Sequence, residues 1–520
     1  MKNNIKLYQL TLLIALVTLA ASCKKQIEID PRQSIPTEQV FTSRDNVNAA
    51  ITGVFARLKN LRMYGRDLIA VSEALSENGF ATNKSGRLVN EAANVPGAHF
   101  ANWQLDYFAI AEINTLLERI PTFNFTPAVT VSERAGWEGQ LYFLRALCYH
   151  DLARTYCYEP GLGVAGQDRG GVPVVTTTPL TIDGANANLP ARADINVVYA
   201  RIYRDLDSAL VKLNNPTSLN PALPSLAAAQ SLYARVALYN RDYTRAAAMS
   251  SLALTTTLGR INSANAYVAG WTSQVHPESL FEVRFANPAE NLGVNESLHT
   301  TYTTLRDRGN PLIVQGFGDL VPGTSLLAQL GFTGNAANGA GGTFSGRSDD
   351  VRNLLYEGGS TARGTARIEC TKFIGKNGQP NLDNIPLIRV PEVLLTRAEA
   401  RANATNRDGS ANTAFNLSNA MADVILLKQN RYSAYATSQS PSDIILQAST
   451  TAAPVINEIL RQRRIELANE GHRWFDYKRT NGLTGTGLSS KLIYTDFRLL
   501  PAVPQREVDG NPNIVQNFGY

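Results

Sequence analysis

The residues that carry most enzyme chemistry are scarce in this chain of 520 residues, which has only five histidines and four cysteines. The histidines lack the spacing of metal ligands within a helix, and no two cysteines form C-x-x-C, which argues against a zinc site. The motifs H-E-x-x-H, G-x-S-x-G and G-x-x-x-x-G-K-[ST] are missing as well. Carboxylates paired by folding stay open as a catalytic alternative. We therefore expect a binding protein, not an enzyme, with no catalytic residues, metal or cofactor.

Charge is also modest. Charged residues make up 18% of the chain and hydrophobic residues 44%, which describes a globular protein and excludes a disordered or coiled-coil chain. Lys2 and Lys6 supply two of the five net positive charges. The remaining excess is too small and too evenly spread to indicate a nucleic-acid partner.

The N-terminus carries a targeting signal. After Lys2 and Lys6, the run 7–19 is mostly apolar, and small residues follow directly before Cys23. The run is short for a membrane-spanning helix, which needs about 20 residues. It predicts a secretory signal, and the small residues before cysteine resemble the lipobox of bacterial lipoproteins. We predict a lipoprotein signal peptide over 1–22 and lipid attachment at Cys23; a signal peptide cut elsewhere is the alternative.

A short tether and three further cysteines follow. Residues 23–36 mix charge with proline and are typical of an extended, lipidated tether. If Cys23 is lipidated, the odd number of remaining cysteines argues against a disulfide framework. We expect Cys148 and Cys157 to stay unpaired, because they could meet only if the chain turns between them.

Helical periodicity dominates most of the rest. Ala234, Tyr243, Ala246 and Ala253 have the spacings of the small and aromatic positions in a tetratricopeptide helix pair. Small residues there let two antiparallel helices approach closely. The sequence therefore predicts a mainly α fold with tetratricopeptide-like helical pairs. The expected helices span 47–58, 103–120, 133–156, 195–213, 225–239, 243–254, 387–428 as a pair, and one that opens at 455.

Other stretches lack this period. Residues 260–386 are rich in Gly, Asn and Thr and predict a loop-rich insertion with a few short strands, such as 279–284. A short strand is also possible at 171–175, and 433–454 predicts a polar linker. Loops on a helical scaffold are where binding residues tend to lie.

Residues 455–480 combine many charges with large rings. An amphipathic helix is followed by Gly471, which can adopt the left-handed conformation that ends a helix, and then by Trp474 and Phe475. We interpret this stretch, called the clasp below, as a buried polar network that joins the last helix to the repeats. A charged helix ending in an ordinary core aromatic pair is the alternative.

Several separated segments resemble one family, the SusD/RagB outer-membrane lipoproteins. The residues that carry the resemblance are R-R-I-E-L-A-N-E-G-H-R-W-F-D-Y-K-R in the clasp, I-R-V-P-E-V-L-L-T-R-A-E-A at 388–400, Q-L-Y-F-L-R-A-L-C-Y-H-D-L-A-R-T-Y at 140–156, and the ending L-L-P-A-V-P-Q-R-E-V-D-G-N-P-N-I-V-Q-N-F-G-Y. The matches run in order from Cys23 to Tyr520.

The resemblance implies a single SusD-like domain over 37–520, with about four tetratricopeptide-like pairs supporting an irregular ligand-binding region. It also implies a lipid-anchored protein on the outer membrane of a Gram-negative cell, facing outward. Its role would be to capture a nutrient, usually an oligosaccharide, for a SusC-like TonB-dependent β-barrel transporter. A peptide ligand, or a repeat scaffold that binds no nutrient, are the alternatives.

Sugar binding requires aromatic faces for the C–H faces of pyranose rings and polar side chains for hydroxyls. The irregular stretches supply both types, and Trp271 is the strongest candidate because it lies outside any apolar period; burial beneath the insertion is its alternative. The candidates are Asn78, Phe80, Asn83, Arg87, His99, Tyr267, Trp271, Tyr302, Arg306, Phe317 and Phe344.

Overall fold

The structure of the chain is a computed structural model. By its internal contacts the chain divides into two compact units, the described residues up to Ala50 with Phe123–Val129, and Ile51–Thr122 with Thr130–Tyr520. The predicted signal peptide, Cys23 and the tether lie outside the described residues. The described residues are 41, 43–125, 127–179, 181–187, 189–214, 220–334, 343–376, 378–484 and 491–520.

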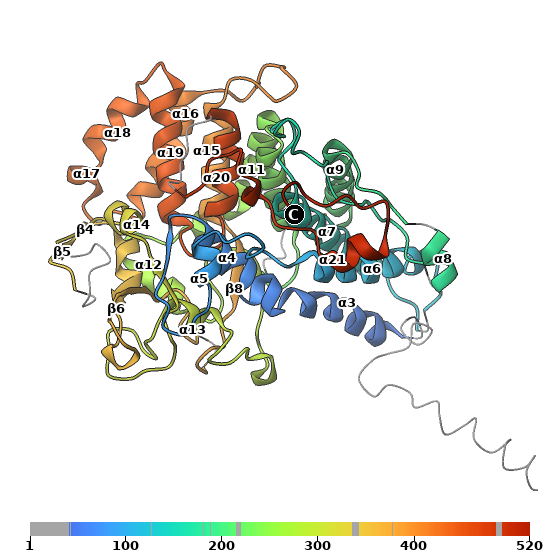
Figure 1. Cartoon of the computed structure of the whole chain (residues 1–520). Helices are drawn as coiled ribbons and strands as arrows, with labels where there is room; N and C mark the ends of the chain where they lie inside the picture. Colours follow the sequence, from blue (N-terminus) through green and yellow to red (C-terminus); the bar gives the residue numbers. More distant parts are fainter. Residues whose placement is uncertain are drawn as a thin grey trace, which may run out of the picture. The chain divides into compact units, whose positions relative to one another are not determined.

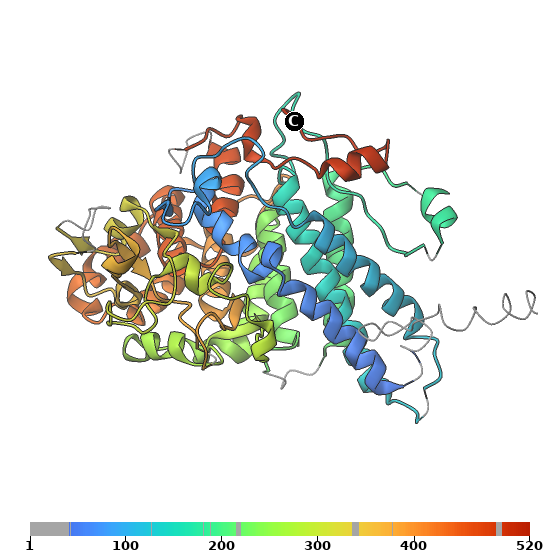
Figure 2. The same ribbon diagram turned by 60° about the horizontal axis from the view of Figure 1, so that its bottom comes forward.

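A row of long helices organises the larger unit, with α6 on α7, α7 on α9, and so on through α10, α11, α15 and α16, while α19 packs on α15 and α16 (Figure 1; Figure 2). This confirms the predicted mainly α, tetratricopeptide-like fold. The helices of the row are α6 (Trp103–Arg119), α7 (Val131–Tyr156), α9 (Ile195–Lys212), α10 (Leu226–Tyr239), α11 (Tyr243–Thr257), α15 (Val390–Ala402), α16 (Leu417–Gln429) and α19 (Ala452–Glu466).

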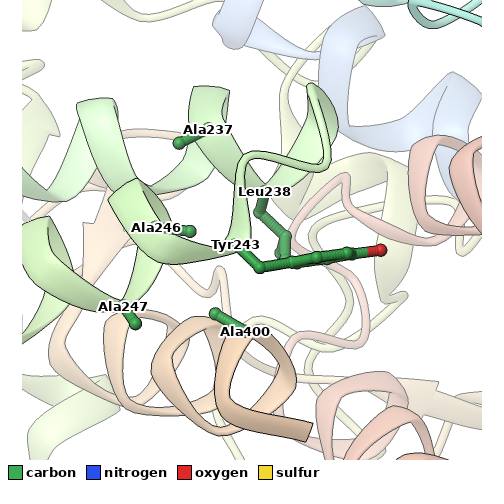
Figure 3. Packing of buried hydrophobic residues seen from close by; sticks show 6 residues of the cluster. All are labelled: Ala237, Leu238, Tyr243, Ala246, Ala247 and Ala400. Atoms are coloured by element: carbon green, nitrogen blue, oxygen red, sulfur yellow. The ribbon is translucent and has the colours of Figure 1, made fainter. Parts of the chain in front are cut away.

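Small residues let α10, α11 and α15 approach closely. Ala246 and Ala247 of α11 lie between α10 and Ala400 of α15, and all three are buried (Figure 3). Tyr243 opens α11 and extends its ring along the edge of this cluster (Figure 3). The predicted small and aromatic positions therefore hold the contact between neighbouring pairs. Side-chain N-caps begin α7, α9, α10, α11 and α16: the Thr130 hydroxyl, for example, accepts a bond from the Glu133 amide at 3.1 Å.

The strands are short and form four two-stranded antiparallel sheets among the described residues. The expected strand at 279–284 is confirmed as β2, but residues 171–175 form no strand. The carbonyl of Val175 instead accepts bonds from the side chains of Asn114 and Tyr149. The pairs are β1 (Gly79–Ala81) with β3 (Leu320–Pro322), β2 (Ser279–Val283) with β8 (Ile385–Arg389), β4 (Phe332–Thr333) with β5 (Gly346–Arg347), and β6 (Tyr356–Gly358) with β7 (Ile368–Cys370).

Two stretches are more helical than expected. The insertion contains α12 (Ala264–Thr272), α13 (Leu298–Tyr302) and α14 (Thr324–Gln329), and α12 packs against the short 3₁₀ helix Val351–Leu355. The predicted linker at 433–454 was wrong, because it holds α17 (Tyr435–Ser438) and α18 (Ser440–Gln447). In α18 the carboxylate of Asp443 is buried against the ammonium of Lys428, 2.5 Å away, which ties this polar helix to α16.

The remaining elements connect the row and complete the C-terminus. The further α-helices are α3 (Arg44–Leu58), α4 (Asp67–Leu75), α5 (Val89–Ala92), α8 (Ile182–Ala187), α20 (Arg473–Thr484) and α21 (Gln505–Gly510), and a π-helical turn spans Leu61–Gly65. Further 3₁₀ turns span Leu258–Arg260, Pro288–Glu290, Thr361–Arg363 and Phe497–Leu499.

The clasp is the buried polar network that the sequence predicts. The carboxylate of Glu466, at the end of α19, lies within 3.0–3.4 Å of the guanidinium groups of Arg431, Arg389 and Arg352. Burial alone would raise the pKa of Glu466, but these three cations lower it well below its usual value. Gly471 has φ +83°, as expected of a residue that separates α19 from α20. An ordinary charged helix end is therefore excluded here.

Cys148, Cys157 and Cys370 are free and buried, so Cys148 and Cys157 are unpaired, as predicted. Among the described residues, we find no helix with the length and apolar character that a membrane crossing requires.

Candidate ligand-binding site

The best-formed surface outside the helical row lies along the β1–β3 ribbon. Beyond the paired strands, the amide of Thr82 donates to the carbonyl of Asp319 at 2.8 Å, and its hydroxyl donates to the carbonyl of Gly318 at 2.7 Å. β7 packs beside β3. Segments near residues 80, 318 and 368 therefore meet at one place.

Two aromatic rings and three arginines mark this place. Phe80 on β1 is 37% exposed, and the guanidinium of Arg367 lies 4.8 Å from its ring centre. Phe317 is partly buried and has two guanidinium groups against its ring, that of Arg87 at 4.8 Å and that of Arg363 at 4.5 Å. These five residues are called the arginine–aromatic surface below. Its rings and guanidinium planes can stack on a flat ligand, and its N–H groups can donate hydrogen bonds.

Two buried carboxylates, those of Asp319 and Glu369, bind the segments that carry this surface. Asp319 accepts hydrogen bonds from the Ser85 hydroxyl at 2.5 Å and from Nε of Arg87 at 2.9 Å. Glu369 accepts from the Thr304 amide and hydroxyl at 2.6 and 2.7 Å, and lies 3.4 Å from Nζ of Lys84. Burial raises the pKa of Glu369, against the lowering effect of Lys84 and the threonine donors. Both carboxylates serve as internal acceptors, which fixes the loop in one geometry.

The backbone of the segments that carry this surface is strained. Asn83 and Leu88 have φ of 57° and 58°, in the left-handed region that non-glycine residues seldom adopt. Gly318 has φ 61°, and a Cβ there would come within 2.7 Å of a Glu369 carboxylate oxygen. Such conformations persist where the surrounding contacts impose them, and they concentrate at ligand-binding sites.

Four of the predicted ligand-binding residues belong here. Phe80, Arg87 and Phe317 form part of the surface itself, and Asn83 is exposed on the loop beside it. Arg363 and Arg367 were missed. They lie in a Gly- and Thr-rich stretch with no recognisable pattern, and only the pairing of β6 with β7 and the contact of β7 with β3 bring them here.

Tyr267, Trp271 and Tyr302 have no ring face open to solvent, since each is at most 1% exposed. Trp271 lies in α12, with the ammonium of Lys372 and the guanidinium of Arg389 at 4.7 and 5.1 Å from its ring centre. The expectation that Trp271 is free to bind a ligand because it lies outside any apolar period was wrong, since the residue is buried in a short helix. Its alternative interpretation, burial beneath the insertion, describes the structure.

The other four candidates are not among the five residues of the arginine–aromatic surface. Asn78 is buried and bridges Glu73 and Arg464, whereas Arg306 is exposed. His99 packs against the ring of Trp474 at 5.7 Å, and burial lowers its pKa to about 3. Phe344 contacts the ring of Phe332 at 5.0 Å.

Two hollows exist elsewhere, of about 420 and 410 Å³, and no predicted ligand-binding residue lines either. The first lies beside Phe497 and Phe518, the second beside Arg241, Glu399 and Leu460. In the portion that the structure covers, His, Cys, Asp and Glu side chains nowhere gather in the threes that could hold a metal ion.

Comparison with known protein families bears on these features. A sequence model described as "SusD family" matches residues 352–520, and one described as "Starch-binding associating with outer membrane" matches residues 28–238. Together they cover the clasp, most of the helical row and the β1 loop. The chain is a SusD-like protein.

Relatives match along the whole length. SusD-like protein P2 of Formosa agariphila is 24% identical, and the alignment covers 98% of this chain and 99% of the relative. A SusD superfamily protein from Bacteroides thetaiotaomicron has a similar structure, with a TM-score of 0.70 at 22% identity, over 92% of this chain and 100% of that one. A structure described as a laminarin-binding SusD-like protein has a TM-score of 0.63 at 18% identity, over 92% and 100%. This SusD-like chain therefore shares the fold of those proteins.

Proposed function

We propose that this SusD-like protein is an outer-membrane lipoprotein that binds an oligosaccharide or polysaccharide and passes it to a TonB-dependent, SusC-like β-barrel transporter. The proposal rests chiefly on Phe80, Asn83, Arg87 and Phe317, four residues predicted from sequence to contact a ligand, which meet on the loop-rich part of the chain. The family description as starch-binding and the laminarin-binding neighbour support a glycan as the ligand. The predicted lipid attachment at Cys23 supports the location.

The chemistry of the surface suits a sugar. A partly exposed ring such as Phe80 can take the C–H face of a pyranose, while Asn83 and the guanidinium groups donate to its hydroxyls. The two carboxylates of this surface are engaged with internal donors, among them the hydroxyls of Ser85 and Thr304. We therefore expect binding without turnover, with a micromolar Kd that corresponds to about −8 kcal/mol and lets the cargo leave again.

Calorimetry with purified protein tests the binding. Laminarin, starch and a set of other plant and algal polysaccharides are titrated into the wild type, and the mixtures are assayed for new reducing ends. Phe80→Ala and Phe317→Ala should each weaken binding about tenfold, as expected for loss of a stacking contact worth ~1.4 kcal/mol. Phe518→Ala is the control, since Phe518 is 44% exposed on another part of the chain. Release of new reducing ends, or binding of peptides alone, would contradict the proposal.

Co-purification tests the partner. A SusC-like barrel should be recovered with the full chain from detergent-solubilised outer membranes. Replacement of Cys23 by Ser should abolish lipid labelling and release the protein from the membrane fraction. If the barrel co-purifies but no glycan binds, the account of a scaffold that binds no nutrient replaces this one.

A further inference from the structure

The arginine–aromatic surface has more positive charge than a neutral sugar requires. Six basic side chains and four acidic ones lie on the segments that meet there, residues 79–88, 303–309 and 315–322 together with 357–370. The basic ones are Lys84, Arg87, Arg306, Arg308, Arg363 and Arg367, and the acidic ones are Asp307, Asp319, Glu357 and Glu369.

Three of the four acidic groups are already committed within the protein. Asp319 and Glu369 are at most 1% exposed and are bound by the donors described above. Glu357 pairs with Arg308 at 3.2 Å and also accepts a bond from the Gly309 amide. Only Asp307 remains as an exposed carboxylate on these segments. These three carboxylates pair with Arg87, Lys84 and Arg308, and the segments as a whole keep a net charge of +2.

Arg363 carries the clearest uncompensated charge. It is exposed, and within the described residues no carboxylate forms an ion pair with it. It ends the 3₁₀ turn Thr361–Arg363, whose N-cap Ser360 is held in place: the Ser360 hydroxyl accepts a bond from the Ala362 amide at 3.2 Å, and the Ser360 amide donates to the Thr304 hydroxyl at 2.8 Å. Stacking on Phe317 holds its guanidinium in place. A pre-oriented guanidinium loses less rotamer freedom when it binds.

Guanidinium groups lie close to both aromatic rings of this surface. Phe317 has Arg87 and Arg363 against it, and Phe80 has Arg367. A ligand that approaches this surface thus meets positively charged guanidinium groups beside the rings. A guanidinium group can form two parallel hydrogen bonds with the two oxygens of a carboxylate or sulfate group, which a neutral hydroxyl cannot offer.

We propose that the ligand of this surface is an anionic polysaccharide, with carboxylate or sulfate groups that pair with Arg363 and its neighbours. This inference rests on the proposed function and names its ligand class. Rings and exposed amides on the same surface bind the sugar itself, while the guanidinium groups select for charge.

Matched pairs of anionic and neutral polysaccharides test whether the surface selects for negative charge. Polygalacturonate is compared with its carboxyl-reduced, neutral form, and carrageenan with its desulfated form, by calorimetry at about 0.15 M salt, where charges more than ~8 Å apart are largely screened. The first pair reports on carboxylate and the second on sulfate. We expect the anionic member of at least one pair to bind at least tenfold more tightly than its neutral counterpart.

Variants of Arg363 test whether this residue is responsible for the preference for anionic polysaccharides. Arg363→Gln should weaken binding of the preferred anionic probe about fivefold, the scale of one partly exposed ion pair, and should leave the neutral probe unchanged. Arg363→Lys keeps the positive charge but loses the planar guanidinium group. Its affinity for the anionic probe should lie between those of the wild type and Arg363→Gln. Arg169→Gln is the matched control, because the guanidinium of Arg169 stacks on exposed Phe518 at 5.6 Å in the same manner. Arg363 is exposed, so the melting temperatures of these variants should equal that of the wild type.

Equal affinity for both members of each pair would overturn the inference and leave the proposed function standing. The inference would also be overturned if Arg363→Gln kept the preference for the anionic probe. The same holds if Arg169→Gln reduced that preference as much as Arg363→Gln does. Failure of every polysaccharide, neutral or anionic, to bind would overturn both. Restoration of binding by Arg363→Lys toward the wild-type value would support charge pairing over a structural effect.

Discussion

Replacement of Trp474 by Ala should destabilise the whole protein without changing what it binds. Trp474 lies in the first turn of α20 and is completely buried. Its ring stacks on Tyr477 at 5.6 Å and meets the edge of His99 at 5.7 Å. Its amide donates to the hydroxyl of Ser72 at 3.1 Å, so this residue joins the clasp to α4.

The magnitude follows from the buried area. A tryptophan side chain buries roughly 150–250 Å², which at ~25 cal/mol per Å² is worth about 4–6 kcal/mol of transfer free energy. Alanine keeps a small part of that area, and the surroundings relax only in part around the cavity. Truncations of this kind cost about 3–5 kcal/mol. We expect a loss in this range from the free energy of unfolding.

Denaturant titration followed by far-ultraviolet circular dichroism measures this loss, because the helical signal does not depend on the deleted chromophore. Phe518→Ala is the control and should shift the midpoint by less than ~1 kcal/mol, since its ring is 44% exposed. Trp474→Ala should keep the wild-type preference among glycans at temperatures where it is folded. A denaturation midpoint equal to that of the wild type would refute the role of the clasp.

Three further changes address the same region. Gly471→Ala should cost about 1–3 kcal/mol in chemical denaturation, because φ is +83° and the new Cβ would lie 2.8 Å from the backbone of Leu68 and Ile69; an unchanged midpoint would contradict the close approach. Glu466→Ala should cost about 3–5 kcal/mol, because it leaves buried guanidinium groups without their acceptor, and a loss below ~1 kcal/mol would show that the remaining carboxylates suffice. Burial raises the pKa of Glu73 to about 7, from 4.5, so between these values the folded state holds a proton that the unfolded state has lost. Stability should therefore fall by roughly 3 kcal/mol as the pH rises from 4.5 to 7, and in Glu73→Gln this decline should disappear from the unfolding free energy; a decline as steep as in the wild type would assign it to other groups.

The helical row could be predicted from the sequence because its signals are local. Ala246 and Tyr243 have the spacing of the small and aromatic positions in a tetratricopeptide helix pair, and the pattern of charged and aromatic residues around Gly471 indicates the clasp. The polar helix α18 could not be predicted from its composition. Its helical state depends on the pairing of Asp443 with Lys428 of α16, a contact made by tertiary folding.

The candidate site could be predicted only in part for the same reason. Phe80 and Arg87 lie on one irregular loop, so local composition was enough to single them out. Arg363 and Phe317 lie far apart in the sequence, and nothing in the residues around Arg363 indicates that the two are in contact. Trp271 was misjudged because burial in a short helix leaves no long apolar period to detect.

Calorimetric titration of glycans into the wild type and into the double variant Phe80→Ala/Phe317→Ala tests the central claim most directly. We predict micromolar binding of at least one polysaccharide without cleavage by the wild type and by Phe518→Ala, and a loss of about a hundredfold in the double variant if the two rings contribute independently. Undiminished binding by a folded double variant would place the ligand elsewhere on the chain and contradict the account.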